Sequence, residues 1–128
     1  MMFIGVDTSN YTASVCALDE KYIFNKRQIL SVKQGERGIR QSEGVFQHMK
    51  IFPRLYNELR GEIDISKVMA VGVSIKPRNV EGSYMPVFLA GMGYARVIAD
   101  TLGVPLYEFS HQDGHIMAGI RSSKRYDL

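Results

Sequence analysis

The chain has 128 residues, 45% of them hydrophobic and 23% charged, with a formal net charge of +3. These values fit one domain with a real core and exclude a disordered chain. No apolar run approaches the ~20 residues of a membrane span, and the N-terminus lacks the features of a secretory signal. We therefore expect a single cytoplasmic domain, residues 1–128, without membrane contact. Cys16 is the only cysteine, which excludes an internal disulfide.

The first part of the chain predicts a meander of three antiparallel strands. Residues 3–6 are an apolar run, residues 7–10 have turn chemistry, and residues 12–18 are small or β-branched. After a second turn, the partly alternating residues 22–32 predict a third strand. Asp7, at the expected end of the first strand, either caps the hairpin as an Asx turn or faces a ligand. The apolar members of the third strand include Ile23, Ile29 and Val32.

A polar, glycine-containing loop over residues 33–44 precedes a predicted helix that continues through Arg60. Pro53 interrupts the helical pattern, so we expect a kink or a restart near Phe52. The apolar residues with helical spacing are Val45, Met49, Phe52, Tyr56 and Leu59. This stripe indicates core packing, and any exposed part of it favours a homodimer through the Val45–Leu59 helix.

The second half of the chain alternates between strands and helices. Residues 68–75 are continuously apolar, which is typical of a central parallel strand. Residues 86–102 predict a helix rich in glycine and alanine, which are usually retained where another backbone or a ligand comes close. Residues 104–107 predict the last strand. Ser110 then stands as the N-cap of a final helix.

The predicted order is β-β-β-α-β-α-β-α with a mixed sheet. This order is typical of the α/β ribonuclease H-like domain that forms each half of the actin-like ATPases. In such sheets ligands gather at the carboxyl ends of the strands. The polar residues expected at this edge include Asp7, Thr8, Ser9, Lys76 and Arg78, together with Ser110 and His111.

His111 and His115 stand four residues apart at the start of the last predicted helix. This spacing places two imidazoles on one helix face, close enough to share a metal ion. The alternative is a pair of solvated or hydrogen-bonded histidines. The convergence of polar residues at the same sheet edge brings the metal interpretation level with this alternative.

Several segments together resemble the TsaD family, long labelled glycoprotease or O-sialoglycoprotein endopeptidase. The resemblance covers nearly the whole chain, and the two-histidine motif is its most specific part. The matching segments are Ile4–Ser9, Val73–Pro77, the helix through Gly91 and Arg96, and His111–His115.

The resemblance implies a two-lobed actin-like fold and transfer of a threonylcarbamoyl group from its adenylate to an adenosine of tRNA. It implies an iron or zinc ion held partly by His111 and His115. ATP or threonylcarbamoyl-adenylate would bind only with a second, C-terminal lobe, and partners would include TsaB-like and TsaE-like proteins. Lys33, Arg37 and Arg40 either contact tRNA phosphates or form a solvated basic face.

The sequence also departs from the family pattern at the expected ligand edge. Asn10, Tyr11 and Thr12 replace acidic residues of the first hairpin, and residues 75–79 replace a Gly-Pro-Gly turn. Asp113 stands where the family usually has glutamate. The second lobe would begin near residue 128, so we expect an N-terminal lobe with an incomplete metal site that is inactive alone.

Three functions therefore remain in competition, and no catalytic residue is assigned. The first is one lobe of a metal-dependent threonylcarbamoyltransferase-like enzyme, which the two histidines favour. The second is a non-catalytic, TsaB-like module that pairs with a TsaD-type partner, which the altered hairpin favours. A metallopeptidase is the least supported, because no glutamate lies between the histidines to act as general base.

Overall fold

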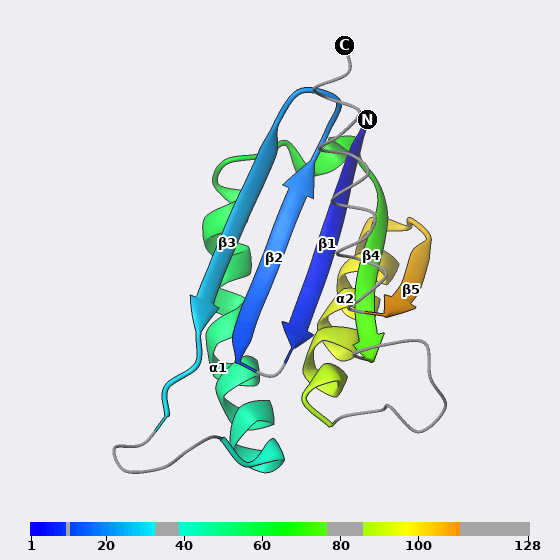
Figure 1. Cartoon of the computed structure of the whole chain (residues 1–128). Helices are drawn as coiled ribbons and strands as arrows, with labels where there is room; N and C mark the ends of the chain where they lie inside the picture. Colours follow the sequence, from blue (N-terminus) through cyan, green and yellow to red (C-terminus); the bar gives the residue numbers. More distant parts are fainter. Residues whose placement is uncertain (10, 33–38, 77–85, 111–128) are drawn as a thin grey trace, which may run out of the picture.

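The computed structural model describes residues 1–9, 11–32, 39–76 and 86–110. It contains one five-stranded sheet with the order β3-β2-β1-β4-β5 and two long helices (Figure 1). The strands are β1 (Met2–Ser9), β2 (Thr12–Leu18), β3 (Ile23–Ile29), β4 (Val68–Lys76) and β5 (Leu106–Ser110). The helices are α1 (Gln41–Arg60) and α2 (Phe88–Leu102), with a short 3-10 helix η1 (Ile65–Lys67) before β4.

The sheet is mixed, as the sequence predicts. β1 pairs antiparallel with β2, and β2 pairs antiparallel with β3, which forms the meander. On its other side β1 pairs parallel with β4, and β4 pairs parallel with β5. The predicted element order is confirmed from β1 to β5. The final predicted helix lies outside the described residues.

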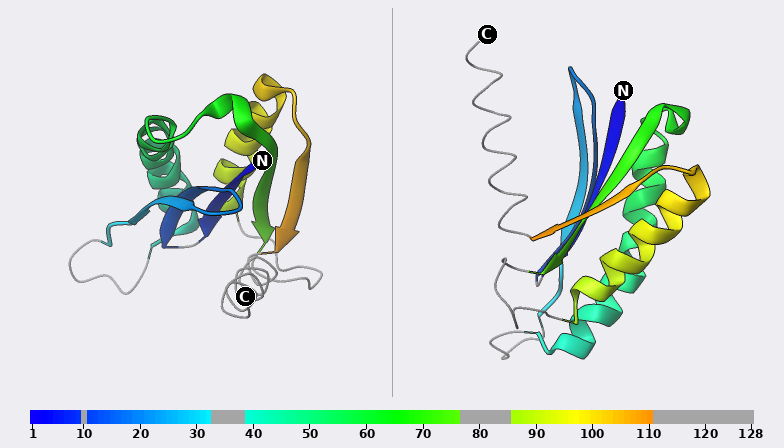
Figure 2. Two further views of the ribbon diagram at one scale, coloured as in Figure 1. Left: turned by 90° about the horizontal axis from the view of Figure 1, so that it is seen from above. Right: turned by 90° about the vertical axis from the view of Figure 1, so that its right-hand side faces the viewer.

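Both helices cover the same face of the sheet (Figure 2). Side chains of a strand alternate between the two faces, so every second residue of β1 and β2 enters the helix-side core. The core is mostly aliphatic, and Phe52 of α1 and Phe88 of α2 are the largest fully buried side chains of the described residues. The strand residues in it include Ile4, Val6, Ala13, Val15, Ala17, Val71 and Val73.

The first predicted turn is partly wrong, because β1 continues through residues 7–9. The antiparallel register with β2 runs as far as Ser9 opposite Thr12, so backbone pairing extends the strand beyond its apolar run. The third strand is shorter than expected, and its named apolar residues do not enter the core. Ile23, Ile29 and Val32 are 51%, 74% and 43% exposed.

Helix α1 begins at Gln41, four residues before the predicted apolar stripe, and its buried face is shifted. The buried residues are Gly44, His48, Phe52, Leu55 and Leu59, whereas Met49 is 54% exposed. Glycine is needed at the first of these positions because an added Cβ would lie 2.8 Å from the Val87 Cγ1 atom. Pro53 lies inside one continuous helical segment, so the expected restart does not occur.

No helix among the described residues has the length and apolarity needed to span a membrane.

Candidate ligand edge of the sheet

The parallel strands β1, β4 and β5 end at one edge of the sheet (Figure 1). Their last residues are Ser9, Lys76 and Ser110. We call this the ligand edge, because open sheets of this kind bind ligands outside the carboxyl ends of their strands. The structure thus brings together three of the segments in which the sequence places polar site residues.

Asp7 is half-buried near the end of β1, and its Oδ1 atom accepts a hydrogen bond of 2.8 Å from the Ser9 backbone N–H. This is the local contact expected of an Asx turn. A carboxylate has two oxygens with several acceptor positions, so this contact still allows a ligand-facing role.

Thr8 faces the helix layer and is fully buried. Its hydroxyl donates to the Val87 carbonyl oxygen at 2.9 Å and accepts from the Gly91 N–H at 3.0 Å. These two groups stand four residues apart at the start of α2, where a helical hydrogen bond would otherwise join them directly. The Thr8 hydroxyl therefore replaces one helical hydrogen bond and joins β1 to α2.

His48 contacts the end of β1 at the ligand edge, and the sequence analysis missed it. It is fully buried on α1, and its Nε2 atom lies 2.8 Å from the Ser9 carbonyl oxygen. Since a carbonyl can only accept, this contact requires the proton on Nε2. The only sequence signal was its position between Gly44 and Phe52 on one helix face. His48 and Thr8 together attach the end of β1 to both helices.

Ser74 is a second missed residue of the ligand edge. It is fully buried on β4, and its hydroxyl has no hydrogen-bond partner among the described residues. The β1–β4 register ends with Val6 opposite Val73, so Asp7 and Ser74 follow this pair on neighbouring strands. A carboxylate and a buried hydroxyl at adjacent strand ends can form hydrogen bonds with the hydroxyl groups of a ligand. They can also bind phosphate groups of a ligand through a cation that the carboxylate holds.

Arg40 is the described member of the predicted RNA-contacting set. It is exposed at the N-cap of α1, where its carbonyl oxygen accepts from the Gly44 N–H at 2.8 Å. Lys76 is the last residue of β4 and is in register with Ser110. Among the remaining predicted site residues, Lys33, Arg37, Arg78, His111 and His115 lie outside the described residues.

Within the described ranges no group of three or more His, Cys, Asp or Glu side chains is placed to hold a metal ion. The predicted metal ligands lie outside these ranges, and in the sequence His111 follows Ser110, the last residue of β5. The assignment of those two histidines as metal ligands stays a prediction.

The fold places the chain in the α/β class of ribonuclease H-like domains used by actin-like proteins. YeaZ from Pseudomonas aeruginosa superposes with a TM-score of 0.57 over 86% of this chain and 43% of that chain, at 18% sequence identity. At that identity the likeness concerns the fold alone. No protein-family model matches the chain.

Sequence relatives give the more specific result. The chain is 29% identical over 117 residues to the tRNA N6-adenosine threonylcarbamoyltransferase of Pyrobaculum calidifontis, and 25% identical over 118 residues to that of Neorickettsia sennetsu. These alignments cover 90% and 91% of the chain. The resemblance to the TsaD family is therefore confirmed. The chain spans about a third of the length of these curated relatives, 33% and 34% respectively.

Proposed function

We propose that the chain acts as one lobe of a tRNA N6-adenosine threonylcarbamoyltransferase-like protein. The observation that carries this proposal is sequence similarity to such transferases over about nine-tenths of the chain. The ligand edge supports it, because Asp7 and Ser74 lie at neighbouring strand ends and β5 leads directly to His111. The lobe would form one wall of the binding site for the donor adenylate. It would also present the two histidines to a metal ion, iron or zinc.

A chimera tests the proposal. Residues 1–128 would replace the matching third of the Pyrobaculum calidifontis transferase, and threonylcarbamoyladenosine formation on tRNA would be measured with threonylcarbamoyl-adenylate as donor. We expect activity from the chimera, none from the isolated chain, and loss of activity in His111→Ala. The exposed Glu20→Ala variant is the matched control. A chimera that is folded by circular dichroism but inactive would refute the proposal.

The metal prediction has its own measurement. Two imidazoles leave at least one protein ligand of a zinc or iron site absent, so the isolated chain should bind the ion weakly. Equilibrium dialysis with zinc should give a dissociation constant well above the submicromolar range. Both His111→Ala and His115→Ala should weaken zinc binding further. Stoichiometric submicromolar binding that disappears in His111→Ala would contradict the predicted incompleteness.

A second candidate function is a non-catalytic module that pairs with a TsaD-type partner or with itself through its helices. The observation that favours it is the set of large apolar side chains that remain exposed on the helix layer. They are Phe46 (60%), Met49 (54%), Leu89 (50%) and Val97 (63%). Partly exposed apolar groups on a two-helix surface are a common feature of protein interfaces.

Association through this surface is tested by Met49→Glu and Val97→Glu in sedimentation equilibrium. If the helices form a homodimer, both variants should shift the chain toward the monomer, because a charge would be buried at the interface. Ile23→Glu, at an exposed position on β3, should leave the association unchanged. A wild-type chain that is monomeric alone and does not bind a TsaD protein would exclude this function.

A further inference from the structure

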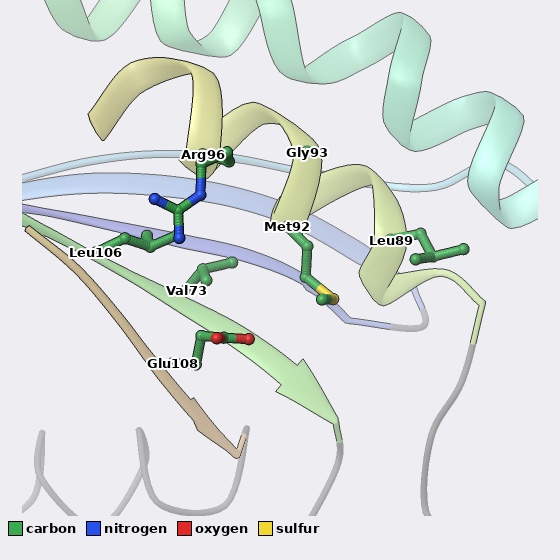
Figure 3. A pocket seen from close by; sticks show the side chains of 7 residues that line it. All are labelled: Val73, Leu89, Met92, Gly93, Arg96, Leu106 and Glu108. Carbon is green, nitrogen blue, oxygen red and sulfur yellow. The ribbon is translucent and has the colours of Figure 1, made fainter. Parts of the chain in front are cut away.

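A pocket of about 350 Å³ lies between α2 and the strands β4 and β5 (Figure 3). Its apolar lining comes from Val73 of β4, Leu106 of β5, and Leu89 and Met92 of α2. The pocket exists because the helices lie over the other strands. α1 packs mainly on β2 and β3, and α2 packs on β1 and β4, so neither of the two described helices covers most of β5. The volume suits one or two aliphatic side chains.

Two opposite charges border this apolar lining. Arg96 extends from α2 toward the sheet, and Glu108 lies across the gap on β5, two residues beyond Leu106 (Figure 3). Arg96 also contacts Asp100 at 3.2 Å, but both side chains are mostly exposed, so this pair holds the guanidinium weakly. The pocket therefore presents a cation and a carboxylate on either side of an apolar centre.

The pocket also adjoins the outermost strand of the described sheet. β5 is the last strand of the order β3-β2-β1-β4-β5 formed by the described residues. Val71 is in register with Leu106, and the Val71 N–H donates to the Pro105 carbonyl at 3.0 Å. Neighbouring residues of a strand direct their backbone groups to opposite sides. The backbone groups of Tyr107 thus point to β4, and those of Leu106 and Glu108 point to the outer edge.

From these three features we propose that β5 and the adjoining pocket bind an extended peptide segment of a partner protein by strand addition. The backbone of the segment pairs with Leu106 and Glu108, and an aliphatic side chain enters the pocket. Side chains two residues before and after it share its face of the added strand. One of these is acidic and contacts Arg96, and the other is basic and contacts Glu108. This docking site is independent of the transfer chemistry.

A peptide with this pattern tests the proposal. The probe is acetyl-Thr-Asp-Thr-Leu-Thr-Lys-Thr-amide, titrated into the isotope-labelled chain and followed by the backbone amide signals. We expect saturable binding that shifts and protects the amides of Leu106 and Glu108. A probe with glycine in place of leucine should bind about tenfold more weakly or worse, because one aliphatic side chain is no longer buried.

Gly93 offers a variant that fills the pocket without disturbing the fold. It lines the pocket, and a Cβ added there would meet nothing within 4 Å. Gly93→Phe should keep the unfolding temperature and lower peptide affinity about tenfold or more. Glu108→Lys should weaken binding about threefold, and a probe with glutamate in place of lysine should restore it.

Other occupants give different results. If N-acetyl-leucine methylamide binds as tightly as the full probe, backbone pairing is not used and the peptide assignment is overturned. If the chain dimerises without peptide and Gly93→Phe abolishes the dimer, the surface pairs with a second copy instead. Absence of saturable binding by the folded chain also overturns the proposal.

Discussion

At the scale of single residues, Thr8 joins the sheet to a helix through one hydroxyl. Because this hydroxyl both donates and accepts inside the core, its removal leaves the Val87 carbonyl and the Gly91 N–H without their partner. The sequence pattern placed Thr8 at the ligand edge by its position in the opening motif. The side chain in fact faces the helices, because β1 continues past the expected turn and alternation places every even-numbered residue on that face.

We therefore expect Thr8→Val to lower the free energy of unfolding by about 1–3 kcal/mol, since a buried donor and acceptor lose their hydrogen bonds. Urea denaturation measures the change. Thr8→Ser retains the hydroxyl and should lose less, and Thr101→Val on the exposed side of α2 should be close to neutral. A near-neutral valine variant beside a destabilised serine variant would show that the methyl group matters and the hydroxyl does not.

Substitution by alanine should change the stability of the fold in opposite directions at two glycines of α2. A Cβ at Gly91 would lie 2.7 Å from the Thr8 Oγ1 atom, whereas a Cβ at Gly93 would meet nothing within 4 Å. Gly93→Ala should raise the free energy of unfolding by up to about 1 kcal/mol through helix propensity, and Gly91→Ala should lower it despite the same propensity gain. Thermal unfolding of both variants decides the matter, and a stabilising Gly91→Ala would contradict the close approach.

At the scale of elements, the two helices are joined at a position created by Pro53. Proline has no N–H, so the Met49 carbonyl four residues earlier lacks its helical partner. The Tyr94 hydroxyl of α2 donates to this carbonyl at 2.8 Å, and the Tyr94 ring stacks on Phe52 with centroids 4.8 Å apart. The predicted break in α1 is absent because a neighbouring helix satisfies the carbonyl that proline leaves open.

Tyr94→Phe should lower the free energy of unfolding by about 0.5–1.5 kcal/mol, the usual net contribution of one hydrogen bond. In a Pro53→Ala background the alanine N–H can satisfy the Met49 carbonyl, so the same tyrosine change should cost less. A double-mutant cycle by urea denaturation measures this coupling. Additive effects would mean that the tyrosine hydroxyl does not compensate for the proline.

The start of η1 gives a pH-dependent prediction. The Ser66 hydroxyl and backbone N–H donate to the Asp64 carboxylate at 2.6 and 3.1 Å and lower the pKa of that carboxyl below its ordinary 3.8. A pKa lowered in the folded state adds stability above the unfolded-state value, and this is lost as the pH falls through the folded-state pKa. An NMR titration should show the pKa of Asp64 rising in Ser66→Ala and remaining low in Ser66→Thr. An unchanged pKa in Ser66→Ala would exclude the hydroxyl as its main cause.

At the scale of the whole molecule, the two described helices cover one face of the sheet, and β5 both ends at the ligand edge and forms the outer side of the described sheet (Figure 2). The proposed RNA contacts come from the segment leading into α1, where Arg40 is exposed next to the first turn. Thr8 and His48 connect this end of α1 and α2 to the strand that carries Asp7. A ligand at the edge and an RNA beside it would therefore contact one connected part of the fold.

The combined variant Lys33→Ala/Arg37→Ala/Arg40→Ala tests the RNA contact. If all three residues neutralise phosphates, tRNA affinity should fall and the slope of log affinity against log salt should shrink by about 2, following counterion release. Fluorescence anisotropy at several salt concentrations measures both. Lys50→Ala/Arg60→Ala, on exposed positions of α1, is the control. An unchanged slope would assign the three residues to a solvated basic face.

The sequence by itself determined the order of strands and helices from β1 to β5, the mixed sheet and the family resemblance. Each of these follows from local periodicity or from a contiguous motif such as residues 4–9. Tertiary structure alone decided which face of α1 is buried, where β1 ends, and that Thr8, His48 and Tyr94 hold the layers together. These depend on residues distant in the chain: Gly44 must make room for Val87, and the Met49 carbonyl finds its donor in Tyr94. Periodicity cannot specify such contacts, because several stripes of one helix are apolar and only packing selects among them.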